Sequence, residues 1–254
     1  MKKLFEKNEV MFAVVLIIIY VVGSSVILNI SDDELVQNIA AAAFNAVMTV
    51  FLLVFIRKNA LMKHIGLCRS EVSAARMWFY IPLVICAAGS LCFGIGLEMS
   101  PTATVFRTVK MLFVGFLEEV IFRGFLFKGI SKSNVTRAIV ISSVTFGVGH
   151  IVNLFNGYDL FYNIMQIIFA VAVGFLLVFI FHRTGSLIAC IGFHSLNNCV
   201  TGFTTAEYLI KALGSEETAS IVLVGVKIVV IVIYMLYVIK LPKRQPTADT
   251  TRVH

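Results

Sequence analysis

Charged side chains are scarce in this chain. They make up 14% of its 254 residues, while apolar residues make up 59% and the mean hydropathy is +0.95. A soluble globular domain has about a quarter charged and about half apolar residues. The polar segments between the apolar runs are also too short to form a soluble domain. This composition excludes an ordinary soluble protein and indicates a polytopic membrane protein.

The cysteines are few and follow no pattern. There are five, an odd number, and neither a CxxC pair nor a Cys/His ligand spacing occurs. These absences argue against a disulfide framework. We interpret the cysteines as small buried apolar residues, at Cys68, Cys86, Cys92, Cys190 and Cys199.

A stripe of basic and aromatic residues is also missing, although the net charge is +7. Nucleic-acid-binding proteins carry their basic residues in such a stripe or patch. Here the Lys and Arg residues gather in the short segments between apolar runs, where membrane topology places them. The charge therefore predicts contact with a lipid bilayer and no nucleic-acid partner.

The apolar runs predict an all-α, polytopic bundle of about eight transmembrane helices. A helix needs about 20 apolar residues to cross the hydrocarbon core. The first run is too long for a signal peptide and lacks a cleavage site, so we expect it to be retained. The runs are 10–30, 38–56, 77–97, 104–128, 136–153, 163–181, 186–203 and 220–240.

The loops fall into two classes that alternate along the chain. The basic segments are 1–9, 57–76, 128–137, 182–185 and 240–254, and the acidic or nearly neutral ones are 31–37, 98–103, 154–162 and 204–219. Eight crossings put all basic segments on one side, so the positive-inside rule predicts that both termini are cytoplasmic. We expect one integral-membrane domain over 1–240 and a disordered cytosolic tail over 241–254.

Two adjacent glutamates interrupt the run 104–128. An ionised carboxylate at the centre of a membrane costs roughly 2.5–3.5 kcal/mol on insertion scales. Glu119 and Arg123 are four residues apart on one helical face, so an ion pair offsets one of the two charges. Glu118 points about 100 degrees away around the helix and is left for chemistry.

Further polar groups lie in two other apolar runs. His150 follows Phe146, which can pack against its ring, and Gly147 and Gly149 allow a neighbouring helix to approach closely. His194 and Asn198 are four residues apart, so both can donate hydrogen bonds to one developing oxyanion. Lys227 interrupts the last run, and the sequence indicates no role for it.

Alternative interpretations remain open for this set. Each histidine alone could simply form a hydrogen bond between helices, and Glu118 could be a proton site in a transporter. Two His and two Glu could also bind a divalent metal at Glu118, His150 and His194. The metal alternative is weaker because Glu119 is committed to Arg123. Other protease designs lack their motifs: there is no HExxH, no GxSxG and no pair of intramembrane aspartates.

The three motifs together resemble a known family. Glu118-Glu119-x-x-x-Arg123, Phe146-x-x-x-His150 and His194-x-x-x-Asn198 resemble the motifs of the type II CAAX prenyl protease family, the Rce1-like or CPBP group. That group also contains bacteriocin-processing and bacteriocin-immunity proteins. The resemblance covers about residues 111–202, and the order of the motifs matches.

The resemblance implies a glutamate-type intramembrane endopeptidase with eight helices around a polar cavity. Because Glu119 is committed to Arg123, we expect no cofactor. Glu118 would activate water together with His150. His194 and Asn198 would bind the oxyanion, and Glu119 and Arg123 would hold the first motif in place. The expected substrate is a lipid-modified CAAX-type protein or a small hydrophobic peptide. The compact loops favour a bacterial plasma membrane. The alternative is a non-catalytic bacteriocin-immunity or partner-binding membrane protein.

Overall fold

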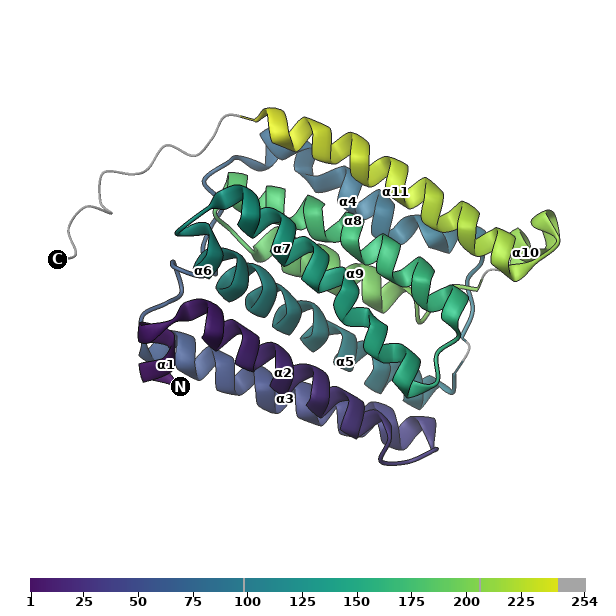
Figure 1. The fold of residues 1–254 in the computed structure, drawn as a ribbon. Coiled ribbons are helices and arrows are strands. Elements are labelled where there is room, and N and C mark those ends of the chain that lie inside the picture. Colours follow the sequence, from purple (N-terminus) through teal and green to yellow (C-terminus); the bar gives the residue numbers. More distant parts are fainter. Residues whose placement is uncertain (98, 206, 242–254) are drawn as a thin grey trace.

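The protein forms a bundle of helices in the computed structural model (Figure 1). The structure describes residues 1–241 except 98 and 206, and the side chains of 92 and 93 are also left undescribed. Residues 242–254 of the predicted tail and the side chain of Cys92 therefore lie outside the described part. In that part, the single β-type pairing is an isolated bridge between Ile95 and Thr204. The helices are α1 (Lys2–Lys7), α2 (Glu9–Leu28), α3 (Glu34–Lys58), η1 (Ala74–Tyr80), α4 (Ile81–Ala88), η2 (Gly89–Phe93), α5 (Pro101–Glu119), η3 (Val120–Phe127), α6 (Lys128–Ser131), α7 (Val135–Val148), η4 (Gly149–Asn156), α8 (Leu160–Thr184), α9 (Ile188–Val200), α10 (Glu207–Leu213) and α11 (Glu216–Lys240).

Polar residues just before the long helices fix where these helices begin. Asp33 accepts a hydrogen bond from the Val36 amide at the start of α3, and Ser100 accepts one from Ala103 at the start of α5. Such side chains satisfy amides that have no partner inside the helix. Asn8, Asn134, Asp159 and Ser215 do the same for α2, α7, α8 and α11.

Six segments are long and apolar enough to cross a membrane. They are Glu9–Leu28, Glu34–Lys58, Ala74–Leu91, Val135–Asn156, Leu160–Thr184 and Glu216–Lys240. They correspond to six of the eight predicted runs and confirm an all-helical, multi-pass membrane architecture. The runs 104–128 and 186–203 are helical as well, as α5 with η3 and as α9. Because α5 carries several charges and α9 has only 13 residues, neither meets this standard, and the count of eight stays a prediction.

The third span is less regular than its apolar sequence predicts. Trp78, Phe79 and Tyr80 have φ angles of 50, 51 and 58°. Non-glycine residues rarely adopt this left-handed conformation unless the surroundings enforce it. Two contacts with α11 hold this segment. Trp78 stacks on Tyr237 with ring centroids 4.1 Å apart, and the Tyr234 hydroxyl donates to the Met77 carbonyl at 2.7 Å.

Helix α5 lies in the middle of the bundle (Figure 1) and packs on α3 and on α9. Gly115 makes the second contact possible, since a Cβ there would lie 2.7 Å from the Ser195 backbone nitrogen. Gly147 likewise brings α7 against α8, where its Cβ would meet the Val171 nitrogen at 2.8 Å. The prediction for Gly149 was wrong, because nothing lies within 4 Å of the corresponding position.

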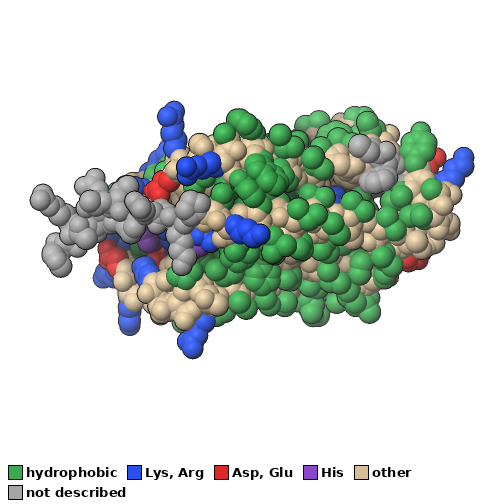
Figure 2. Space-filling model, turned by 90° about the horizontal axis from the view of Figure 1, so that it is seen from above, with side chains coloured by type: hydrophobic (Ala, Val, Ile, Leu, Met, Phe, Trp, Pro, Cys, Tyr) green, Lys and Arg blue, Asp and Glu red, His purple; other side chains and the backbone are tan. Residues whose placement is uncertain are grey.

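The surface divides into an apolar body and a charged end. Figure 2 shows hydrophobic side chains over most of the visible face and most Lys and Arg side chains toward one end. That end holds α1 and α6 (Figure 1), where Lys132 Nζ lies 2.6 Å from the Glu9 carboxylate. The structure therefore gathers the N-terminal segment and the segment after η3 at the same end of the bundle.

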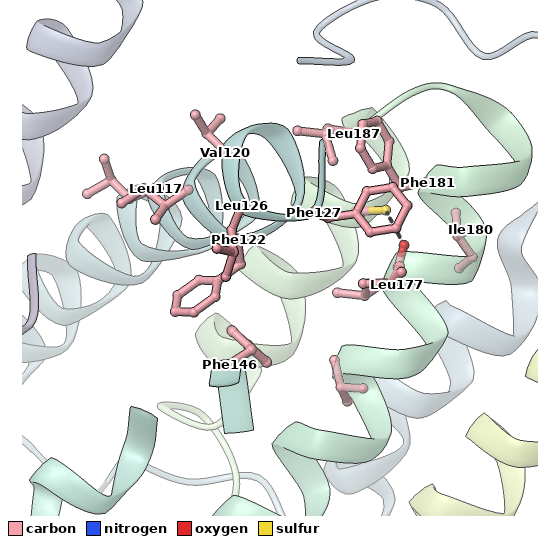
Figure 3. Close-up of a cluster of buried hydrophobic side chains, with 14 of the residues drawn as sticks. Leu117, Val120, Phe122, Leu126, Phe127, Phe146, Leu177, Ile180, Phe181 and Leu187 are labelled. Carbon is pink, nitrogen blue, oxygen red and sulfur yellow. Dashed lines mark hydrogen bonds between the residues drawn. The ribbon is translucent and has the colours of Figure 1, made fainter. Parts of the chain in front are cut away.

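The buried core surrounds the C-terminal half of the long central helix. All residues of η3 are buried. Its Phe122, Leu126 and Phe127 belong to one cluster with Phe146 of α7 and with side chains of α8 (Figure 3). Close packing of this kind restricts side-chain movement. The packed core therefore restricts the movement of Glu118 and Glu119, which precede η3, and of Arg123, which lies within it.

Candidate active site

The first motif ends α5 and continues into η3. Glu119 and Arg123 are both completely buried, and Arg123 Nη1 donates to Glu119 Oε1 at 3.0 Å. The guanidinium also lies 4.1 Å from the centroid of the Phe146 ring and donates to the Gly174 carbonyl at 3.5 Å. The ion pair predicted from the four-residue spacing is therefore present, and it links α5 to α7 and α8.

The backbone changes from α-helix to π-helix directly after Glu119. The π-helical segment is η3 (Val120–Phe127). Such segments are rare and frequently occur at functional sites. The sequence carries no evident signal for it, since the run around it has ordinary helical periodicity. The change places the two glutamates at the last turn of regular α-helix.

His194 on α9 lies between the two glutamates. Its Nδ1 is 2.8 Å from Glu119 Oε1, and its Nε2 is 3.6 Å from Glu118 Oε2. A carboxylate only accepts hydrogen bonds, so Nδ1 carries the proton that it donates to Glu119. Nε2 then carries a proton only when the ring is doubly protonated. Glu119 thus orients the imidazole, as second partners of functional histidines commonly do.

The Glu118 carboxylate has a partner that sequence reasoning missed. The Tyr20 hydroxyl of α2 donates to Glu118 Oε1 at 3.0 Å. Glu118 Oε2 receives no hydrogen bond from the described residues. One carboxylate oxygen is thus held by the tyrosine, while the other is a buried acceptor that none of the described residues satisfies.

His150 lies at the start of η4, one turn after Phe146. Its Nδ1 lies 3.1 Å from the Phe146 carbonyl, which fixes this nitrogen as the donor. The Phe146 ring is edge-on to both histidine rings, with centroids 5.5 Å from His150 and 5.6 Å from His194. Asn163 of α8 donates to the His150 carbonyl at 2.9 Å and fixes the backbone there.

One cavity brings four of the six predicted site residues together. It has a volume of about 470 Å³, and Glu118, His150, His194 and Asn198 all line it. Glu119 and Arg123 do not line it and lie behind it in the core. Asn197 Nδ2 donates to Asn198 Oδ1 at 3.4 Å, which leaves the Asn198 amide hydrogens as donors.

The predicted alternative of a divalent metal needs a group of ligands held close together. In the part of the chain that the structure describes, no three His, Cys, Asp or Glu side chains form such a group. The expectation of catalysis without a cofactor stays a prediction, and it has its own experiment below.

Residues 100–200 match the family model described as type II CAAX prenyl endopeptidase, Rce1-like. This region is Rce1-like. The match contains all three motifs and confirms the resemblance noted from them. No curated protein and no solved structure matches the chain. The matched region and the apolar helices together indicate a multi-pass membrane protein that contains a region similar to a protease family. Tyr20 and Lys227 lie outside the matched residues.

Proposed function

We propose that this protein is an intramembrane endopeptidase. It hydrolyses a peptide bond in a lipid-modified CAAX-type protein or in a small hydrophobic peptide. The observation that carries the proposal is the convergence of Glu118, His150, His194 and Asn198 on one cavity. These residues come from three parts of the chain and supply a base, a second water ligand and two hydrogen-bond donors.

Glu118 acts as the general base in this mechanism. A water molecule held between Glu118 Oε2 and His150 loses a proton to the carboxylate and attacks the substrate carbonyl. Tyr20 holds the other carboxylate oxygen and keeps Oε2 aimed at the water. The proton then passes from Glu118 to the leaving amine, so that the carboxylate is regenerated when the peptide bond breaks.

His194 and Asn198 stabilise the oxyanion of the tetrahedral intermediate. The Asn198 amide donates one hydrogen bond, and His194 donates the other from Nε2 in its doubly protonated form. Glu119 accepts from Nδ1 of the same ring at 2.8 Å and fixes its orientation. Glu119 pairs with both Arg123 and His194, so each buried charge of this network has a charged partner.

The proposed topology adds α5 with η3 and α9 to the six apolar spans, which gives eight helices around the cavity and both termini on the cytoplasmic side. In this arrangement α9, whose 13 residues reach about 20 Å at 1.5 Å per residue, crosses the membrane together with the residues that flank it.

The decisive test compares cells that produce the wild-type protein with cells that produce Glu118→Gln. This change keeps the shape of the side chain and removes the base. We expect specific C-termini or hydrophobic peptides to be processed in the first cells and to remain uncut in the second. Glu6→Gln, at an exposed position of α1, is the matched control and should process normally.

Two results would contradict the proposal. Normal processing by Glu118→Gln at wild-type protein level would remove Glu118 as the base. An intact cellular phenotype after alanine substitution at Glu118, His150, His194 and Asn198 would instead indicate a bacteriocin-immunity or partner-binding protein.

A separate experiment tests the mechanism without a cofactor. Stoichiometric metal in the purified protein, together with loss of activity after chelation, would replace this mechanism by a metal-dependent one.

A further inference from the structure

A second cavity lies at the charged end of the bundle, apart from the cavity that holds Glu118. It has a volume of about 290 Å³ and lies between the residues that follow η3, the first residue of α7 and the end of α8. The two cavities share none of their described lining residues. The proposed hydrolytic mechanism therefore leaves the second cavity without a role.

The lining of the second cavity combines basic and apolar side chains. Lys128 and His182 line it together with Phe127 and Phe181. Among the described residues that line it, there is no Asp or Glu. A lining of this kind suits an anion that is attached to an apolar group.

Aromatic contacts hold the two basic side chains in defined positions. Lys128 Nζ lies 5.4 Å from the centroid of the Phe181 ring, within the range of a cation–π interaction. The His182 ring is edge-on to Phe127, with centroids 6.1 Å apart. The two phenylalanine rings are buried and contact each other edge to face at 5.9 Å (Figure 3). Because the basic groups are already positioned, an anion that binds them orders few further side chains.

Both basic side chains can donate to a phosphate oxygen. An ammonium group has three donors, and an imidazole has at least one N–H in either protonation state. Lysine is a common phosphate ligand in proteins. The Ser131 hydroxyl, which also lines the cavity, donates to the Lys128 carbonyl at 2.9 Å. Lys128 and His182 are therefore the expected ligands.

The cavity lies at the level where two membrane spans end. Val135 is the first residue of the span Val135–Asn156, and His182 lies two residues before the end of the span Leu160–Thr184. Lipid headgroups lie at the boundaries of the hydrocarbon core. The basic segments 128–137 and 182–185 meet here, on the side predicted to be cytoplasmic. A ligand in this cavity is therefore at the depth of a lipid headgroup.

We propose that the second cavity binds the phosphate of an anionic phospholipid, with Lys128 and His182 as its ligands. Basic pockets between transmembrane helices on the cytoplasmic side are suited to such headgroups. Val135 and further apolar side chains along α7 are exposed and offer a surface to the acyl chains. A soluble phosphate would gain nothing from this surface, which favours a lipid as the occupant.

Native mass spectrometry of the full chain in a neutral detergent measures this binding without a peptide substrate. The protein is titrated with phosphatidylglycerol and, separately, with phosphatidylcholine, whose positive choline compensates the phosphate. We expect the first phosphatidylglycerol to bind about tenfold or more tightly than phosphatidylcholine, because hydrogen bonds between charged groups are strong. The double variant Lys128→Met/His182→Phe, which keeps an aromatic ring beside Phe127, should lower this preference to less than about twofold.

Matched variants separate this site from basic charge in general. Lys128→Arg keeps the charge and should keep the preference for phosphatidylglycerol. Lys63→Met removes an exposed lysine beside His64, which contacts Glu9 at the same end of the bundle. Lys63 lines neither cavity, so this variant should also keep the preference. Thermal unfolding of each variant in phosphatidylcholine checks that the bundle is intact.

Equal binding of the two lipids would overturn the site. A preference that survives the double variant would overturn it too, because basic charge elsewhere at this end would then attract the lipid. Inorganic phosphate at the same concentration as the lipid should leave the bound phosphatidylglycerol in place. If it displaces the lipid, the occupant is a soluble anion and the lipid assignment is wrong. None of these outcomes bears on the proposed endopeptidase, whose test is peptide processing.

Discussion

The Glu119 carboxylate makes two contacts through one oxygen atom, to Arg123 at 3.0 Å and to His194 at 2.8 Å. Arg123 alone would make Glu119 a structural residue. The contact with His194 gives it a second effect, because it determines which ring nitrogen can face Glu118. At the scale of single residues, the glutamates therefore divide their roles: Glu118 faces the cavity, and Glu119 positions the imidazole from behind.

Tyr20→Phe tests how Glu118, the proposed base, is held. The change removes one hydroxyl, which is the donor to Glu118 Oε1. A hydrogen bond to a charged group contributes about 1.5–3 kcal/mol, so kcat should fall by about tenfold or more, with a smaller effect on KM. Tyr158→Phe, at an exposed position on the same cavity, should keep the wild-type rate. An unchanged kcat in Tyr20→Phe would show that this hydroxyl does not orient the base.

The sequence predicts local pairs of this site and misses distant ones. The spacing of four residues was enough to predict the Glu119–Arg123 ion pair and its burial. Tyr20 lies 98 residues from Glu118, in a run whose apolar character already explains a tyrosine. Nor could the sequence show that His194 contacts both glutamates, because that depends on how closely α9 approaches α5.

At the scale of helices, the site depends on the contact between α5 and α9. Gly115 lies one turn before Glu119. Because glycine has no side chain, the Ser195 backbone can occupy the space that a Cβ at position 115 would need. Gly115 lies in an apolar run, and the sequence alone did not predict that this glycine contacts α9. The π-helical segment η3 was also unpredicted, because hydropathy reports burial and not hydrogen-bond register.

Gly115→Ala should separate the two helices. The new Cβ would lie 2.7 Å from the Ser195 nitrogen and 2.9 Å from its Cα, and backbone atoms cannot rotate away. Overpacking of this kind costs about 1–3 kcal/mol of stability. A displacement of about 1 Å at a catalytic site can lower activity about a hundredfold. Activity and thermal unfolding of the purified variant measure both effects.

Gly192→Ala is the matched control, on α9 itself. Nothing lies within 4 Å of its Cβ position, and alanine is favoured over glycine in a helix by about 1 kcal/mol. This variant should be as stable as the wild type or more stable, with full activity. Wild-type activity in Gly115→Ala would mean that the α5–α9 distance does not set the geometry of the site.

At the scale of the whole molecule, the number of crossings decides on which side of the membrane the segment after η3 lies. If only the six most apolar segments cross, α5 stays on one side, and residues 32 and 133 lie on the same side. If α5 with η3 also crosses, they lie on opposite sides.

The ion pair between Lys132 and Glu9 at 2.6 Å joins the segment after η3 to the start of α2, whereas Asp32 follows the end of α2. We therefore expect Asp32→Cys and Ser133→Cys, in a protein whose native cysteines are replaced by alanine, to react with an impermeant maleimide from opposite sides. Intact cells should label the first, and inside-out vesicles the second. Labelling of both from the same side would exclude a crossing by α5 and would contradict the bundle of eight helices.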